Sequence, residues 1–541
     1  MQITDCSFQQ LPFSKLFKTY TSAYGKLDAF YETSPFDEAQ ITRRFENFDF
    51  KGDRARTVEA LRAFNEPFDH HQKARNNLER LQEEDALAIV TGQQLGIYGG
   101  PLYTVLKTIS TIHLAQRMEK VLERPVIPIF WLADEDHDYD EVRSMQILSR
   151  DNIQQFELPA KQQPSPAVAE MSLPAGFAQL KEEVRSALYE TEFSDDLWQL
   201  LDDCFSPDET YFKAFGQFIC RLFSKYGLVL AGSNHPEVKE ITKSILKRSV
   251  SNAEQLKDAL AEQTEQVKIS YHQQVTLYDS NIFWFSDSGA RLKIDHPDED
   301  SWIVSEGESW TTDELLQQID KTPERFSPNV FLRPILQDAL LPTLGYVAGP
   351  GEVAYYAQMK SFYASFERAM PVIFPRLSGT LIEPAVDRIM GELPFEFADY
   401  SQRIEDLEST YVEHSEQVDI EALFSDWKQK VEQISESRTS AIAEVDATLE
   451  GAAGKATAVY YGELDKLKGK VYRAVKQQDQ TQLNRIGKIK THLFPENELQ
   501  ERLLSPIYYM NKFGVDIWDD LLASLDEEET LNRHKLFEIQ P

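Results

Sequence analysis

TGQQLGIYGGPLYTVLK, at residues 91–107, is the stretch that decides the fold, and VIPIFWLADEDHD follows it at 126–138. The apolar run at 87–90 is typical of a buried parallel strand, and residues 104–122 have helical periodicity. A strand, a helix and a second strand within about fifty residues form the βαβ unit of a doubly wound sheet. Ligands of such sheets bind beyond the carboxyl ends of the strands, so both stretches are expected to border one cleft.

The bulk composition limits the class of protein. A chain of 541 residues exceeds what one hydrophobic core organises, so two or three structural units are expected. The 56 basic and 89 acidic side chains give a formal charge of -33, which disfavours nucleic acid and anionic membranes as partners. Three cysteines without metal or disulfide spacing, and apolar stretches too short to cross a bilayer, predict a cytoplasmic protein.

The predicted α/β core is discontinuous along the chain. Prolines between 157 and 177 disfavour regular structure there, which indicates that the chain leaves the sheet. The expected parts are the first part of the core at 1–150, an insertion at 151–225, a return strand at 226–235, a second insertion at 236–325, the rest of the core at 326–385, and a C-terminal segment at 506–541 that packs on the core.

Residues 386–505 are predicted to form a long helical domain. Apolar side chains from Ile420 to Val471 recur at the three- and four-residue spacing of a coiled-coil seam. Residues 401–450 carry thirteen acidic and four basic side chains, whereas 461–490 carry three acidic and eight basic ones, so two antiparallel arms would attract. The glycines of GAAG, 451–454, predict the hairpin tip, and the exposed stripes left on one hairpin suggest a homodimer.

The glycine-rich turn after the first strand suits an anion. Backbone N–H groups and the positive end of a helix dipole favour a phosphate, and paired amides can hydrogen-bond a polar ligand. The glycine spacing matches neither the phosphate-binding loop of nucleoside triphosphatases nor the dinucleotide fingerprint, so a tight structural loop is the alternative. The residues predicted to bind a nucleotide or anion are Gly92, Gln93, Gln94, Gly99, Gly100, Tyr103 and Lys107.

The acidic run DEDHD, 134–138, leaves three interpretations open. Carboxylates and imidazole are metal ligands, they can also bind a substrate ammonium group, and they can simply cap the following helix in solvent. In the second interpretation a carboxylate or His137 acts as acid or base. Asp136, His137 and Asp138 are therefore the catalytic candidates, and Asp134 is a candidate for substrate binding.

Two further groups lie in the second half of the chain. Arginine binds carboxylates bidentately, which makes Arg333 and Arg376 candidates for an anionic substrate, although a salt bridge within the protein is the alternative for each. Asp338, Glu352 and Tyr355 complete the predicted substrate-binding set. A possible second nucleotide site, for which domain packing is the alternative, comprises Arg502, Tyr508, Tyr509, Asn511 and Lys512.

Several long motifs resemble the bacillithiol biosynthesis cysteine-adding enzyme family nearly end to end. They are VTGQQLGIYGGPLYTVLKTIS, PVIPIFWLADEDHDYDEV, ERFSPNVFLRPILQDALLPTLGYVAGPGEVAYYAQMK, MPVIFPRLSGTLIE and FPENELQERLLSPIYYMNKFG. The resemblance implies a Rossmann-like core with two connecting insertions, a coiled coil that dimerises, and kinship of the core with class I aminoacyl-tRNA synthetases. Unlike those synthetases, this sequence has no His-x-Gly-His at 91–107 and no lysine in PRLSGT, 375–380.

The resemblance also implies a reaction, the joining of cysteine to the amine of glucosaminyl-malate as the last step of bacillithiol synthesis. Formation of this amide is expected to use ATP, with Mg²⁺ as a candidate ion and no metal ligand assigned. Asp136 or His137 would deprotonate the amine, and Arg333 or Arg376 would hold the malate carboxylates. A metal-dependent hydrolase built on the acidic run and a nucleotide-sensing coiled-coil scaffold are the alternatives.

Overall fold

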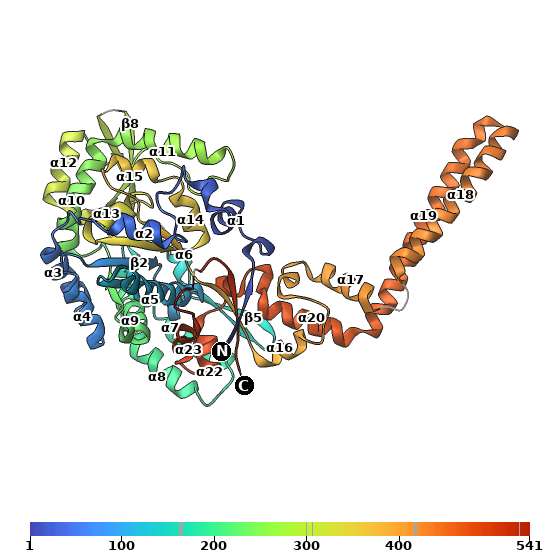
Figure 1. Cartoon of the computed structure of the whole chain (residues 1–541), viewed down its shortest axis with the longest axis horizontal. Coiled ribbons are helices and arrows are strands. Elements are labelled where there is room, and N and C mark those ends of the chain that lie inside the picture. Colours follow the sequence, from blue (N-terminus) through green and yellow to red (C-terminus); the bar gives the residue numbers. More distant parts are fainter. Residues whose placement is uncertain (162–165, 299, 306, 416–418, 530, 541) are drawn as a thin grey trace. The chain divides into compact units, whose positions relative to one another are not determined.

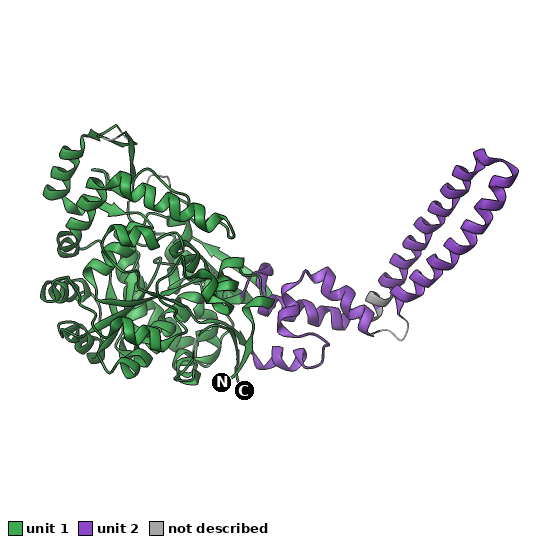
Figure 2. Ribbon diagram, turned by 45° about the horizontal axis from the view of Figure 1, so that its top comes forward, with its two compact units in different colours: residues 1–381, 500–539 green, residues 382–499, 540–541 purple. Residues whose placement is uncertain are grey.

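The computed structural model describes residues 1–161, 166–298, 300–305, 307–415, 419–529 and 531–540. The chain forms two compact units (Figure 2), of which the first contains Met1–Leu381 and Gln500–Ile539 and the second contains Ile382–Leu499. The predicted limits of the helical domain, 386 and 505, are therefore wrong by a few residues. Gln500 belongs to the first unit because its side chain bonds both backbone groups of Leu381, at 2.9 and 3.1 Å.

A parallel five-stranded sheet forms the centre of the first unit. Its order is β13-β12-β2-β3-β6, so the chain adds strands on one side of β2 and then crosses to add β12 on the other. This is the doubly wound order predicted from the sequence, and the direction of winding reverses between β2 and β12. The strands are β2 (Leu87–Gln93), β3 (Val126–Leu132), β6 (Val229–Ala231), β12 (Thr343–Ala348) and β13 (Val372–Pro375).

Burial explains why these segments form the sheet and its cover. Every residue of β3 is buried, and α5 (Tyr103–Leu122), which connects β2 to β3, has only a few exposed side chains near its end. Strands covered on both faces read as continuous apolar runs, as these do. No helix in the described residues is long and apolar enough to span a membrane. The helices before β2 are α1 (Lys15–Ser22), α2 (Glu38–Phe45), α3 (Arg54–Asn65) and α4 (Gln72–Arg80).

Two insertions interrupt the core, as predicted. The first lies between β3 and β6, and it shares one hydrophobic cluster with the sheet, in which the rings of Phe130 and Phe215 are 5.9 Å apart. Its elements are α6 (Tyr139–Val142), β4 (Ser144–Ser149), β5 (Asn152–Glu157), α7 (Phe177–Ala187), α8 (Ser194–Cys204) and α9 (Tyr211–Phe223).

The second insertion lies between β6 and β12 and contains an antiparallel sheet of order β10-β9-β8-β7-β11. Its elements are α10 (Pro236–Ser251), α11 (Ala253–Lys268), β7 (Ile282–Phe285), β8 (Arg291–Asp298), β9 (Ser301–Val304), β10 (Ser309–Trp310), α12 (Thr312–Lys321) and β11 (Phe326–Pro328). The core then resumes with α13 (Leu332–Leu340), and α14 (Pro350–Tyr356) and α15 (Lys360–Ser365) connect β12 to β13.

The two ends of the chain meet in a three-stranded sheet of the first unit (Figure 1). The C-terminal strand lies between the N-terminal strand and the strand that follows β13, and its pairing with the N-terminal strand is antiparallel. The strands are β1 (Gln2–Cys6), β14 (Ser378–Ile382) and β15 (His534–Glu538), and α21 (Gln500–Leu503), α22 (Pro506–Phe513) and α23 (Ile517–Ser524) precede β15.

The second unit contains the predicted coiled-coil hairpin, formed by α18 (Ile420–Val445) and α19 (Glu450–Gln478) in Figure 1. Lys428 pairs with Asp465 across the arms at 2.7 Å, in keeping with the charge difference between them. The predicted tip is wrong, because GAAG lies inside α19 and the turn is at 446–449. There the carboxylate of Asp446 accepts bonds from the backbone N–H and hydroxyl of Thr448, at 2.9 and 2.7 Å. The other helices are α16 (Pro384–Met390), α17 (Ile404–Ser415) and α20 (Gln480–Leu493).

Candidate active site

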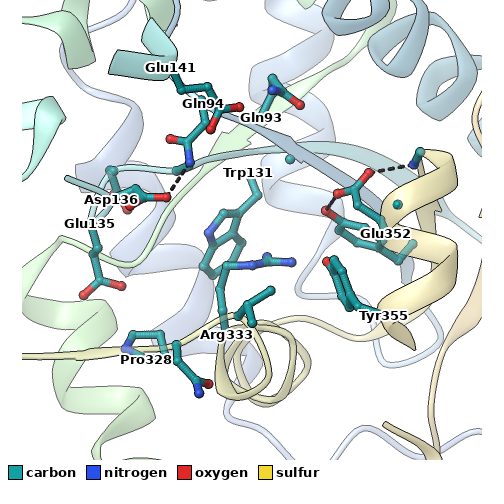
Figure 3. A pocket seen from close by; sticks show the side chains of 18 of the residues that line it. Gln93, Gln94, Trp131, Glu135, Asp136, Glu141, Pro328, Arg333, Glu352 and Tyr355 are labelled. Carbon is teal, nitrogen blue, oxygen red and sulfur yellow. Dashed lines mark hydrogen bonds between the residues drawn. The ribbon is translucent and has the colours of Figure 1, made fainter. Parts of the chain in front are cut away.

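A cavity of about 540 Å³ lies beyond the carboxyl ends of β2, β3 and β12, where the winding of the sheet reverses (Figure 3). Its walls come from both halves of the chain and from β8 of the second insertion. This is the place at which doubly wound sheets bind ligands. The residues singled out in the sequence that line it are Gly92, Gln93, Gln94, Tyr103, Lys107, Asp134, Asp136, Arg333, Glu352, Tyr355, Arg376 and Arg502.

Lys107 joins the two halves of the core at this point. Its Nζ lies 2.6 Å from Glu352 Oε2, 3.0 Å from the carbonyl oxygen of Gly92 and 3.2 Å from Gln93 Oε1. Burial lowers the pKa of Lys107, and the charge of Glu352 partly restores it. An ammonium group has three N–H donors, and each of these has an acceptor. Lys107 therefore holds the cavity wall together, and its charge is not presented to a phosphate as the sequence suggested.

Glu352, like Lys107, is bonded to other groups of the protein, and it caps the beginning of α14. Its carboxylate accepts a bond from the backbone N–H of Gly349 at 2.6 Å and from the hydroxyl of Tyr346 at 2.8 Å. A carboxylate at the first turn satisfies free N–H groups and the positive end of the helix dipole. The second glycine turn is thus closed by its own acidic residue, and Tyr355 lines the cavity beside it.

Arg376 lines the cavity but is already paired inside the protein. Its Nη2 lies 2.6 Å from Glu501 Oε1, and both side chains are buried. Glu501 also accepts bonds from the hydroxyl of Ser378 at 3.0 Å and the backbone N–H of Gly379 at 2.8 Å. For Arg376 the alternative of an internal salt bridge is therefore the one that the structure shows, and its partner comes from the C-terminal segment.

Arg333 differs from the other predicted cations of the cavity. It lies at the start of α13, where its guanidinium donates to Gln337 Oε1 at 3.1 Å and lies over the ring of Tyr346, 5.5 Å from the centroid. Among the described residues it forms no ion pair. Arg333 therefore offers its charge to the cavity. Asp338 lies elsewhere, because its buried carboxylate accepts from the hydroxyl of Tyr363 at 2.9 Å.

Asp136 is the centre of a polar network on the opposite side of the cavity. Its carboxylate accepts bonds from the amide of Gln94 and from the backbone N–H of His137, the latter at 2.8 Å, and lies 3.4 Å from Arg291 Nη1. Burial alone would raise the pKa of Asp136. The bonds from His137 and Gln94 and the charge of Arg291 outweigh burial and lower it. Asp136 is therefore held as a carboxylate.

The other acidic residues of the run 134–138 each interact with a different part of the protein. Asp134 is buried and accepts bonds from the backbone N–H groups of Ser233 and Asn234, at 2.9 and 3.0 Å, and burial raises its pKa to about 7. Glu135 forms a buried ion pair with Lys239. Asp138 caps α6, as in the solvated-loop interpretation of the run. Among the described residues no three acidic, histidine or cysteine side chains are grouped to hold a metal ion.

Nine residues singled out in the sequence lie outside the lining of the cavity. Gly99 has φ +87°, and a Cβ there would lie 2.6 Å from the ring of Phe218. Asn511 accepts from the hydroxyl of Ser194 at 3.0 Å and donates to the carbonyl of Tyr189 at 2.8 Å, so α22 packs against the first insertion. Packing thus accounts for most of the second candidate nucleotide site, of which only Arg502 reaches the cavity. The nine are Gly99, Gly100, His137, Asp138, Asp338, Tyr508, Tyr509, Asn511 and Lys512.

Several cavity residues were not predicted, among them Arg291, Trp131 and Glu141. Arg291 begins β8, and the alternating pattern of that strand gives no sign that it reaches Asp136, 155 positions earlier. Trp131 continues the apolar run of β3, so the sequence gives no sign that this residue lines a cavity. Glu141 follows the acidic run and could have been included with it.

Comparisons with known proteins agree with this architecture. Residues 1–377 match the model of the bacillithiol biosynthesis BshC N-terminal Rossmann-like domain, and 379–539 match that of the BshC C-terminal coiled-coil domain. Proteins named "Putative cysteine ligase BshC" are similar along the chain. That of Salinibacter ruber is 32% identical, covering 95% of this chain and 94% of its own, and that of Koribacter versatilis is 32% identical, covering 99% and 100%. This chain therefore belongs to the BshC family of bacillithiol biosynthesis.

Proposed function

We propose that this protein is an ATP-dependent ligase that joins the carboxyl group of cysteine to the amine of glucosaminyl-malate. The observation that carries the proposal is one cavity with an acidic side at the end of β3 and, on α13, the guanidinium of Arg333, which forms no ion pair with any described residue. An acidic side suits amines, and a guanidinium suits carboxylates. The name of the relatives, "Putative cysteine ligase BshC", supports the same reaction.

In this proposal the malate carboxylates bind Arg333. Arg376 was the other candidate, but its charge is compensated by Glu501. The triphosphate would lie toward Arg502 and Tyr103, on the side of the cavity formed by the start of α5 and by α21. Mg²⁺ would accompany ATP as an ion bound chiefly by the phosphates, as is common for this ion.

The amine of the sugar attacks the activated carbonyl carbon of cysteine, the C–N bond forms, and the phosphate or adenylate group leaves. The proton of the amine passes to a base in the cavity. Asp136 is a weak base because its pKa is lowered. Glu141 suits the task better, because partial burial against the cavity and the negative charges of Asp136 and Asp138 raise its pKa to about 7.

The test is a reconstituted reaction. Purified protein is incubated with cysteine, ATP and glucosaminyl-malate, and the amide product is measured by mass spectrometry together with the nucleotide product. We expect product only when all three substrates are present, and Arg333→Gln should raise KM for the sugar substrate about tenfold or more through loss of a charge-assisted bond. Absence of product, with no stimulation of ATP turnover by cysteine, would reject the proposal. Hydrolysis of the sugar substrate without ATP would favour the hydrolase.

We also propose that the hairpin of α18 and α19 joins two copies of the chain. Its buried apolar cluster is small, consisting of Ile420, Phe424 and Leu464 together with Val412 of α17. Large apolar side chains farther along both arms are exposed, among them Ile434 at 63% and Val459 at 68%. Apolar positions of this kind along a coiled-coil hairpin are typical of contacts with another helix.

A further inference from the structure

Two polar atoms in the wall of the cavity have no hydrogen-bond partner among the residues that the structure describes. The indole Nε1 of Trp131 and the amide Oε1 of Gln94 are buried and without a hydrogen bond in the described part of the chain. Both residues line the cavity, and Trp131 is only 1% exposed. Buried polar atoms are nearly always paired, so an unpaired donor and an unpaired acceptor in one binding cavity point to a ligand.

The two residues are neighbours because of the sheet. Trp131 of β3 pairs with Gly92 of β2, and Gln94 lies two positions beyond Gly92. Figure 3 shows the indole in the middle of the cavity wall, with Gln94 and Asp136 on one side and Glu352 and Tyr355 on the other. One ligand can therefore face both atoms.

The orientation of the Gln94 amide is fixed by its partner. Its Nε2 donates to the carboxylate of Asp136. A rotated amide would place an oxygen against that carboxylate, which is unfavourable because neither atom is a donor. Gln94 therefore presents an acceptor to the ligand, and Trp131 can present only a donor.

We propose that Trp131 and Gln94 recognise the hydroxyl and amine edge of the amino sugar in the acceptor substrate. This inference rests on the proposed function. The group at Trp131 must be an acceptor, because an indole N–H can only donate. The proposed function assigns the malate carboxylates to Arg333, so a hydroxyl oxygen of the sugar is the acceptor left for Trp131. The group at Gln94 must be a donor, which a second hydroxyl or the amine supplies.

Binding without turnover tests this assignment. Isothermal titration with glucosaminyl-malate alone measures affinity in the absence of ATP and cysteine, so it gives an answer even if the ligase reaction fails. Trp131→Phe removes the N–H and keeps an aromatic ring, and we expect Kd to rise about tenfold, the typical effect of one lost hydrogen bond. Trp518→Phe is the matched control, because Trp518 is equally buried and also has an unpaired Nε1 but lies outside the cavity.

A second titration identifies the part of the substrate that is recognised. Malate without the sugar should bind wild type and Trp131→Phe equally, because the proposal gives Trp131 no contact with the acid, and should lose affinity in Arg333→Gln. The proposal is overturned if Trp131→Phe binds glucosaminyl-malate as wild type does, or if it loses affinity for malate to the same degree. It is also overturned if steady-state kinetics show a raised KM for cysteine and an unchanged KM for the sugar substrate.

Discussion

At the scale of single residues, the cavity separates charges that stabilise the protein from charges that face a ligand. Lys107 and Arg376 looked alike in the sequence as cations near strand ends, but each has a carboxylate partner, in Glu352 and Glu501. Arg333 has none among the described residues. A salt bridge depends on a residue far away in the sequence, so residue type alone could not distinguish these roles.

Lys107→Met should destabilise the first unit by about 3 kcal/mol, because it leaves the carboxylate of Glu352 without its buried cation. Urea unfolding followed by tryptophan fluorescence measures the change. The double variant with Glu352→Gln removes both charges and should recover part of the loss, since no unpaired ion remains. A loss below about 0.5 kcal/mol in Lys107→Met would mean that the pair does not hold the wall of the cavity.

With Glu141 as the proposed base, the reaction is expected to depend on pH. Its pKa is raised to about 7, so below that pH the carboxyl is protonated and cannot accept a proton from the amine. We expect kcat/KM to rise with pH through about 7 and then to level off. Glu141→Gln should lower kcat/KM about 100-fold and abolish this rise.

Asp136→Asn tests the same profile from a second residue, because the carboxylate of Asp136 stays charged throughout the assay range and its charge helps to raise the pKa of Glu141. Loss of that charge should move the midpoint of the rise to lower pH without abolishing the rise. A rise that persists in Glu141→Gln assigns the base to another group.

At the scale of elements, the sequence predicts strands and helices well where the pattern is local. The run from Val126 to Leu132 is apolar throughout, and it is a strand buried at every position. The hairpin tip was predicted wrongly because two glycines were taken as a turn. α18 ends at Val445, six positions before GAAG begins, and the bonds that Asp446 accepts from Thr448 shape the turn that follows.

The position of the turn can be tested with substitutions that change the helix propensity of residues 451 and 454. Gly451 and Gly454 lie within α19, and a Cβ at either position meets nothing within 4 Å. Alanine is favoured over glycine inside a helix by about 1 kcal/mol, so Gly451→Ala and Gly454→Ala should each raise the melting temperature of the hairpin, measured by circular dichroism. Destabilisation by both would instead place the turn at GAAG.

At the scale of the whole molecule, the doubly wound core, its two insertions and the helical domain could be predicted, whereas the part of the cavity wall that comes from the second insertion could not. Asp136 and Arg291 are 155 positions apart and meet only through the second insertion. Hydrophobic periodicity reports which face of an element is buried, but it does not report which insertion covers the end of a strand. For this reason the acidic run was found in the sequence while its cation was not.

The proposed dimer is a property of the whole molecule and can be measured directly. The chain has a mass of 62.2 kDa, and light scattering at micromolar concentration should give about twice that value for the wild type. Ile434→Glu combined with Val459→Glu places charges on the exposed apolar positions and should yield a monomer. Gln433→Glu, at an exposed polar position of the same helix, should remain dimeric. A monomeric wild type would contradict the proposal.

β15 is the central strand of the three-stranded sheet that it forms with β1 and β14, and this position has a consequence for protein synthesis. A ribosome releases the N-terminal strand first, yet β1 finds its neighbour only when residues 534–538 have been made. Glu501, which neutralises Arg376 in the cavity wall, is also translated late. The nascent chain therefore exposes an unpaired edge of β1, and Arg376 lacks its carboxylate partner, until residues 501–538 have left the ribosome.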